Sequence, residues 1–181
     1  DKYFYICMMN KPNTIRFIGT TSPLNLISVA TIEECVSYCK DKFVLGVDTE
    51  TEGFDFTCKK MIMLQIGDKE RQYVIDTRVI DVTPLKQILE DEKIIKIFHN
   101  AKFDYKFIKR WANIDVQGIY DTYLMERVIN CGKQDYGYSL ARCVDRYLGI
   151  NLDKTTRSKF IGLTGQPFTV DQITYGSKDV I

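Results

Sequence analysis

Carboxylates stand at several places in this chain where charged groups are unexpected. Asp48 and Glu50 follow the apolar run 43–47 and are separated by one residue. In a strand, side chains two positions apart point to the same face and lie about 7 Å apart. Two like charges at this separation repel each other unless a cation lies between them. The pair therefore indicates a cation site, although acids are also common where a strand passes into a turn.

A third carboxylate lies inside an apolar helical stripe. Apolar side chains repeat at helical spacing along 101–112, at Phe103, Phe107, Ile108 and Trp111. Asp104 falls within this stripe, and a charge that faces a core must be paired, hydrogen-bonded or bound to a metal ion. A buried salt bridge with a lysine is the alternative to a metal ligand. Asn100, one turn earlier on the same side, favours a functional role.

The fourth carboxylate, Asp179, lies four residues after Tyr175 on an expected helix, so a phenol and a carboxylate face the same way. Alone, this pattern is typical of an ordinary solvated face. Four acids together are a donor set of hard oxygen ligands, which suit Mg²⁺ or Mn²⁺. Two such ions can activate a water molecule and stabilise the leaving oxygen of a phosphodiester. The chemistry implied is phosphoryl transfer to water.

The elements that must position these residues alternate in type. Apolar runs predict five strands, at 43–47, 61–67, 72–76, 93–98 and 114–119. Capping residues and helical periodicity predict helices that begin at Thr31 and Thr83 and others at 101–112, 121–130, 139–148 and from 169 onward. This order predicts an α/β fold with a mixed five-stranded sheet flanked by helices.

The sequence also predicts where the domain begins and whether the chain is a fragment. Residues 1–30 show no sustained period and are interpreted as an N-terminal extension, with the domain at 31–181. The chain opens on Asp1 and stops at Ile181 inside an expected helix, so we expect a fragment truncated at its C-terminal end.

Composition narrows the class of protein further. With 181 residues, 45% of them hydrophobic, the chain has the size of one ordinary domain with a full core. The 25 basic and 24 acidic residues give a net charge of +1, which argues against holding long duplex nucleic acid by charge alone. The six cysteines form no CxxC pair, which predicts a reducing, intracellular compartment. No apolar run approaches the roughly 18 residues of a membrane span, so no membrane partner is expected.

Three motifs carry a resemblance to a known family. The segments VDTETEG (47–53), HNAKFD (99–104) and YGSKD (175–179) resemble, in order, the motifs of the DEDD 3′-to-5′ exonucleases. The tyrosine four residues before the last aspartate is similar to the DEDDy branch, which includes A-family DNA polymerase proofreading domains and ribonuclease D. The resemblance runs from about residue 31 to the end and implies an RNase-H-like (DnaQ-like) fold.

The resemblance also implies roles for the motif residues, around two divalent ions, Mg²⁺ or Mn²⁺. Asp48, Glu50 and Asp179 would bind one ion, and Asp48 would bridge to the second. Asp104 would hold that second ion through water, and Tyr175 would orient the attacking water.

Several further residues are candidates for contacts with the substrate or for structural roles. Asn100 matches a motif position near the substrate. Phe54 and Phe56 follow the first motif and are candidates to stack on bases near the ions, although aromatic side chains more often belong to a core. Asp121 is interpreted as a charge at a helix N-terminus rather than a metal ligand. The single histidine, His99, is interpreted as a packed, hydrogen-bonded side chain.

The expected activity is hydrolysis at a single-stranded or frayed DNA 3′ end, as in proofreading, with release of nucleoside 5′-monophosphates. The hairpin spacing and the 53–60 segment resemble polymerase proofreading domains, which implies a polymerase domain in the same full-length chain. Two alternatives stay open: an RNA 3′ exonuclease like ribonuclease D, and an inactive exonuclease fold kept as a binding module. A composition rich in Asn, Lys, Ile and Tyr is typical of an AT-rich genome and adds an apicomplexan plastid as an expected location.

Overall fold

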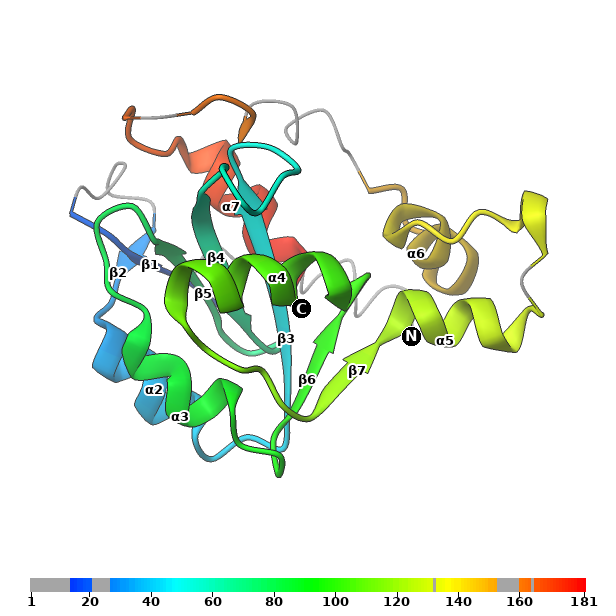
Figure 1. The fold of residues 1–181 in the computed structure, drawn as a ribbon, viewed down its shortest axis with the longest axis horizontal. Coiled ribbons are helices and arrows are strands. Elements are labelled where there is room, and N and C mark those ends of the chain that lie inside the picture. The colour runs from blue at the N-terminus through cyan, green and yellow to red at the C-terminus, as the bar shows by residue number, and fades with distance from the viewer. Residues whose placement is uncertain (1–13, 21–26, 132, 153–159, 164) are drawn as a thin grey trace.

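One seven-stranded mixed sheet forms the centre of the molecule (Figure 1). The computed structural model describes residues 14–20, 27–131, 133–152, 160–163 and 165–181. The strand order is β2-β1-β5-β4-β3-β6-β7, with β3-β4 and β4-β5 antiparallel and the other neighbours parallel. The strands are β1 (Ile15–Ile18), β2 (Ser28–Val29), β3 (Val44–Thr51), β4 (Met61–Gly67), β5 (Gln72–Asp76), β6 (Ile95–Phe98) and β7 (Ile119–Asp121).

The mixed α/β sheet predicted from the sequence is confirmed, but the number of strands was wrong. Seven strands replace the expected five, because β1 and β2 come from the stretch interpreted as an extension and pair at the edge beside β5. Strands of four and two residues are too short for periodicity to reveal. The boundary between residues 30 and 31 stays a prediction.

The last strand lies later in the chain than predicted. The run 114–119 was expected to be a strand, whereas β7 covers Ile119–Asp121. Ile114 and Val116 are buried, 0% and 3% exposed, in the connection between the preceding helix and β7. A buried loop thus produced the alternating apolar pattern of a strand.

The helices begin close to where capping residues predict them. They are α2 (Ile32–Cys39), η2 (Thr83–Leu85), α3 (Lys86–Leu89), α4 (Ala101–Ala112), α5 (Thr122–Ile129), η3 (Gln134–Tyr136), α6 (Leu140–Leu148) and α7 (Val170–Lys178). The side chains of Thr31, Ser139 and Thr169 accept hydrogen bonds from the backbones of α2, α6 and α7. Thr169 and Gln172 form a complete capping box.

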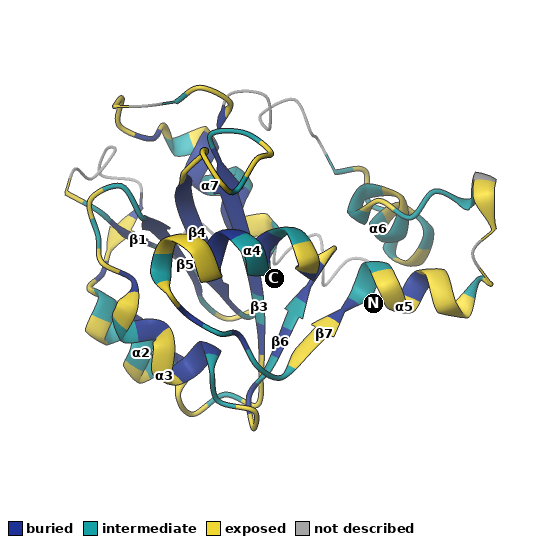
Figure 2. Cartoon of the chain, in the orientation of Figure 1, coloured by how far each residue is buried: buried dark blue, intermediate teal, exposed yellow. Residues whose placement is uncertain are grey.

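Helices cover the two faces of the sheet with separate cores. On one face α2, α3 and α4 pack against β3, β4 and β5 through residues such as Cys35, Leu89 and Phe107. On the other face α7 packs through Ile173 against a cluster that includes Met63. Helices α5 and α6 extend to one side, and α6 has no buried residue (Figures 1 and 2). Strand β3 therefore runs between α4 and α7.

The five described cysteines are free thiols, and Cys7 lies outside the described residues. No helix in the described part of the chain has the length and apolarity to span a bilayer.

Candidate active site

Strand β3 directs alternate side chains to the two cores, and this alternation positions the first two acids. Leu45 and Val47 belong to the core shared with α4. Asp48 and Glu50 therefore point to the opposite face, toward α7. Glu50 is 8% exposed, so its carboxylate lies where water reaches it poorly.

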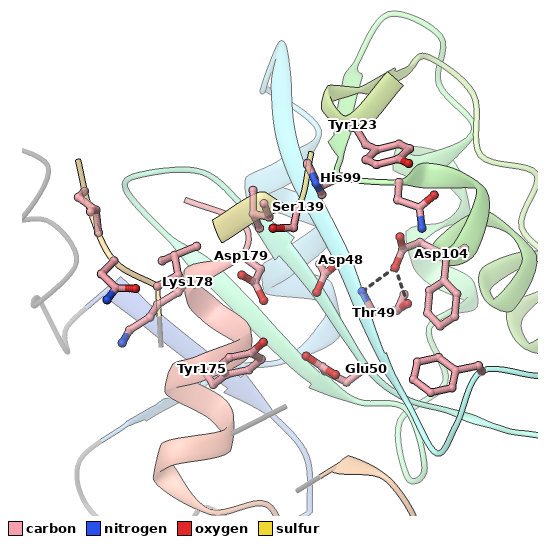
Figure 3. Close-up of a pocket in the computed structure, with 17 residues that line it drawn as sticks. Asp48, Thr49, Glu50, His99, Asp104, Tyr123, Ser139, Tyr175, Lys178 and Asp179 are labelled. Atoms are coloured by element: carbon pink, nitrogen blue, oxygen red, sulfur yellow. Dashed lines mark hydrogen bonds between the residues drawn. The ribbon is translucent and has the colours of Figure 1, made fainter. Parts of the chain in front are cut away.

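Helix α7 brings the third acid to this pair. Ligand oxygens of Asp48, Glu50 and Asp179 all lie within 4.8 Å of one another. The close approach depends on Gly46, because a Cβ atom there would lie 2.9 Å from the Cα of Val180. Figure 3 shows the three carboxylates together, with the Tyr175 ring and the Glu50 carboxylate pointing toward one another. Residues predicted from two separate motifs are thus brought together as expected.

Asp104 approaches the site from the other face of the sheet. Its Oδ1 accepts hydrogen bonds from the Thr49 backbone N–H at 3.1 Å and from the Thr49 hydroxyl at 2.6 Å (Figure 3). The side chain is 3% exposed, and no ion pair of the described residues includes it. The threonine, rather than a lysine, is the buried partner. Asp104 lies outside the group of three ligands but lines the same cavity.

The electrostatics of the cluster oppose ionisation of its acids. Burial raises the pKa of Asp48 well above its usual range, and the charges of Asp104, Asp179 and Glu50 raise it further. Burial also raises the pKa of Asp104 to about 7, against the opposing effect of its hydrogen bonds with Thr49. Like charges held this close are stable in ionised form when a cation compensates them.

The donor set fits a hard divalent cation. Three carboxylates converge, and neither the single histidine nor any described cysteine belongs to the group. Oxygen-only donor sets suit Mg²⁺ or Mn²⁺ rather than zinc. Asp48, Glu50 and Asp179 would hold one ion, and Asp104 lies on the other side of β3 as a candidate for contact with a second.

A cavity of about 550 Å³ opens beside the acids. The acids form one wall, and aromatic and aliphatic side chains form much of the rest. The lining residues are Asp48, Thr49, Glu50, Phe54, His99, Asn100, Phe103, Asp104, Tyr123, Ser139, Leu140, Ile150, Asn151, Leu152, Tyr175, Lys178 and Asp179. A cavity lined both by carboxylates and by aromatic and aliphatic side chains suits a nucleotide, which has a charged phosphate and an apolar base.

The two candidate stacking residues have different surroundings. Phe54 lines the cavity, is 71% exposed, and contacts Phe103 edge to face with ring centroids 6.4 Å apart. Phe56 does not line the cavity and packs instead on Phe107 of the core, with ring centroids 6.5 Å apart. Of these two phenylalanines, Phe54 thus lies where a base could stack, and Phe56 belongs to the core.

Asn100 lines the cavity in a left-handed backbone conformation. It precedes α4 with φ of 75°, and its side chain makes no capping hydrogen bond. Asp121 accepts hydrogen bonds from the backbone N–H groups of Asn100 and Ala101, and from those of Tyr123 and Leu124 at the start of α5. Asp121 therefore fixes two helix N-termini, in agreement with its structural interpretation.

His99 also has the predicted packed environment. Its ring nitrogens lie 3.0 Å from the Thr122 hydroxyl and 2.9 Å from the Tyr138 carbonyl oxygen. These contacts join the residue after β6 to the first residue of α5 and to the segment before α6, so the ring connects this part of the cavity lining to the sheet.

Sequence reasoning missed several residues of the cavity. Thr49 stands between two predicted acids, and its short hydroxyl side chain was a usable signal. Lys178 precedes Asp179 and lines the cavity. The wall near α6, including Ser139 and Leu140, gave no signal, because only the tertiary fold brings it to the acids.

This mixed sheet, with carboxylates gathered beside β3 between α4 and α7, defines an RNase H-like, DnaQ-type exonuclease fold. Residues 28–181 match the family model described as 3'-5' exonuclease, DNA_pol_A_exo1. The chain belongs to this 3′-to-5′ exonuclease family.

Individual relatives include both DNA and RNA enzymes. The chain is 28% identical to DNA polymerase I of Aquifex aeolicus over 151 residues, which are 83% of this chain and 24% of the relative. It is 29% identical to Ribonuclease D of Nitrobacter hamburgensis over 163 residues, 84% of this chain and 40% of the relative. The structure of Escherichia coli RNase D, an exoribonuclease, matches with a TM-score of 0.71 and 26% identity, covering 82% of this chain and 39% of that one. The chain thus spans less than half the length of these relatives.

Proposed function

We propose that this chain is an active, metal-dependent 3′-to-5′ exonuclease of the DEDDy type, which removes nucleotides from a DNA 3′ end. The observation that carries the proposal is the convergence of Asp48, Glu50 and Asp179 within 4.8 Å, with Asp104 and Tyr175 in the same cavity. All five motif residues are present and gathered, which argues against an inactive binding module.

The proposed reaction is hydrolysis of the last phosphodiester bond. A water oxygen bonds to phosphorus while the bond from phosphorus to the 3′ oxygen of the preceding nucleotide breaks. The products are a nucleoside 5′-monophosphate and a strand with a new 3′ hydroxyl. Divalent ions, when bound, would supply an activated water and charge stabilisation for the leaving oxygen.

The protein residues would position the reacting groups. Asp48, Glu50 and Asp179 would hold one ion and Asp104 the second through water. The Tyr175 hydroxyl, which points toward Glu50, would orient the attacking water (Figure 3). Phe54 would stack on a base at the 3′ end, and Asn100, which also lines the cavity, would contact the same nucleotide.

The RNA exonuclease is a second candidate, because the relatives include several ribonucleases D beside DNA polymerase I. Matched single-stranded DNA and RNA oligonucleotides of one sequence separate the two. We expect faster degradation of the DNA, and faster degradation of an unpaired than a paired 3′ terminus. A clear preference for RNA would replace the proofreading proposal by the RNA-trimming one.

We also propose that the full-length chain contains a polymerase domain, and we propose a cellular location. The match to DNA polymerase I, which continues well beyond the matched part, supports the first. Free thiols support a reducing intracellular compartment, and the composition typical of an AT-rich genome supports an apicomplexan plastid. Imaging of the tagged protein in its own cells tests the location.

A further inference from the structure

Gln65 is a buried amide without a partner. It lies in the middle of β4 and is 0% exposed. Its Nε2 and Oε1 are the only buried side-chain nitrogen or oxygen atoms of the described residues that lack a hydrogen-bond partner. Buried polar groups are almost always hydrogen-bonded, so each exception needs an explanation. An apolar residue of similar size would fill the same space without this penalty.

The sheet register places Gln65 beside the acid cluster. Gln65 stands directly opposite Asp48 in the antiparallel pairing of β3 with β4. Directly opposite residues share a face of the sheet, with Cβ atoms about 4.5–5.5 Å apart. On its other side Gln65 is paired with Val74, which belongs to the core beneath α7. The amide therefore lies on the face that carries Asp48 and Glu50.

The last turn of α7, which carries Tyr175 and leads to Asp179, covers this amide. A Cβ atom at Gly176 would lie 2.6 Å from the Nε2 atom of Gln65. Glycine at this position leaves the space that the amide occupies. Gly176 lies between Tyr175 and Asp179 on α7, so the unpartnered amide is enclosed between the Asp48 strand and the turn leading to Asp179.

We propose that Gln65 is a positioning residue for the cation site. Its Nε2 donates a hydrogen bond to the Asp48 carboxylate when a divalent cation is bound. Asp48 is the cross-strand neighbour of Gln65, and a flexible glutamine side chain spans that separation. A donor to the ionised carboxylate stabilises the form that binds a cation. The inference rests on the proposed function, because it requires the cation site.

Carboxylates that bind metal ions are commonly oriented by hydrogen bonds from groups that do not touch the ion, and loss of such a group costs about 10–100-fold in metal affinity or activity. A buried amide with a purely structural role would behave differently. Its replacement by an apolar side chain would remove an unsatisfied group and leave cation binding unchanged.

The test compares Mn²⁺ binding, measured by isothermal titration calorimetry, with thermal unfolding in EDTA. The variant Gln65→Met keeps the approximate volume and removes the amide. We expect its Mn²⁺ dissociation constant to rise about ten-fold or more, while its melting temperature in EDTA stays equal or rises. Met63→Leu, two residues away on the same buried face, is the matched control and should bind Mn²⁺ as the unaltered chain does.

A second variant keeps the inference testable if Gln65→Met does not fold. In Gly176→Ala the added Cβ atom must displace the amide, and we again expect weaker Mn²⁺ binding. Unchanged Mn²⁺ affinity in the variant that folds would overturn the role of Gln65 alone. Failure of the unaltered chain to bind Mn²⁺ and to degrade an oligonucleotide would overturn the proposed function, and this inference with it.

Discussion

At the scale of single residues, the site depends on buried acids whose charges are compensated only in part by the protein. Asp104 is the clearest case, because two hydrogen bonds from Thr49 hold one oxygen while burial raises the pKa to about 7. A side chain used only for stability would not need to be an acid at this position. The arrangement is explained by a ligand that brings positive charge.

Replacement of this acid by its amide tests that explanation. Asp104→Asn keeps the shape and an oxygen that can accept from Thr49, so we expect the fold to survive. Cleavage should fall by about 10³-fold or more, because the negative charge is lost at the point where cations act. Steady-state cleavage assays and melting temperatures measure the two effects. Asp145→Asn, at an exposed position on α6, is the control, and equal activity in both variants would contradict the role of Asp104.

Tyr175 is expected to matter less than the acids. Tyr175→Phe removes the hydroxyl that faces Glu50 but keeps the ring packed near Phe160, at a centroid distance of 6.0 Å. We expect kcat to fall by about 10²-fold with little change in melting temperature, because a misplaced reacting group typically costs about that much in rate. A loss as complete as that of Asp104→Asn would point to a different role for the phenol.

The raised acid pKa values predict an unusual dependence of stability on pH. The pKa of Asp104 is about 7 in the folded chain and ordinary in the unfolded one, so between about pH 4 and 7 the folded state binds the extra proton. Stability in EDTA should therefore fall as pH rises through this range. Thermal melts from pH 5 to 8 measure it, and Asp104→Asn should flatten the profile. An EDTA-treated chain that becomes more stable toward pH 8 would contradict the prediction.

At the scale of elements, α5 and α6 are joined by one buried carboxylate. Glu126 is 5% exposed and accepts hydrogen bonds from Arg146 at 2.6 Å and from the Tyr147 hydroxyl at 2.9 Å. Arg146 also donates to the carbonyl oxygens of Tyr136 and Gly137. Because residues at the start of α6 line the cavity, this network sets the position of that part of the cavity wall.

Arg146→Ala should loosen that wall. We expect the free energy of unfolding to fall by about 1–3 kcal/mol, since a buried carboxylate loses its charged partner. The effect on cleavage should appear mainly as a higher KM, because the acids themselves are not disturbed. Arg142→Ala, an exposed arginine on the same helix, is the control. A fall in kcat without a change in KM would contradict a role in shaping the cavity.

The elements also show what the sequence alone can predict. Strong periodicity and capping residues were sufficient for β3, α4 and α7, which position the acids, and for the neighbouring strand β4. The short strands β1 and β2 were missed, because their place depends on the pairing of β1 with β5 and of β2 with β1 rather than on local pattern. Phe54 and Phe56 differ by two positions in sequence, and only packing separates the cavity residue from the core residue. Gln65 could have been noticed in the sequence, because it is the one polar side chain in the apolar run 61–67. All seven residues of this strand are buried.

At the scale of the whole molecule, two packed faces of one sheet bring three distant segments together. Helix α4 approaches β3 from one side and α7 from the other, so the acids meet beside this strand rather than on either outer surface (Figure 1). This geometry favours a cation site, because a shared cation would compensate the charges of the three carboxylates that converge there.

The most direct test follows degradation of a 5′-labelled single-stranded oligonucleotide by the chain in EDTA, in Mg²⁺ and in Mn²⁺, with Asp48→Asn alongside. We predict a ladder of labelled products that shortens from the 3′ end one nucleotide at a time, only with added metal ion and only with Asp48 intact. Full cleavage in EDTA, or equal cleavage by Asp48→Asn, would contradict the metal-dependent site.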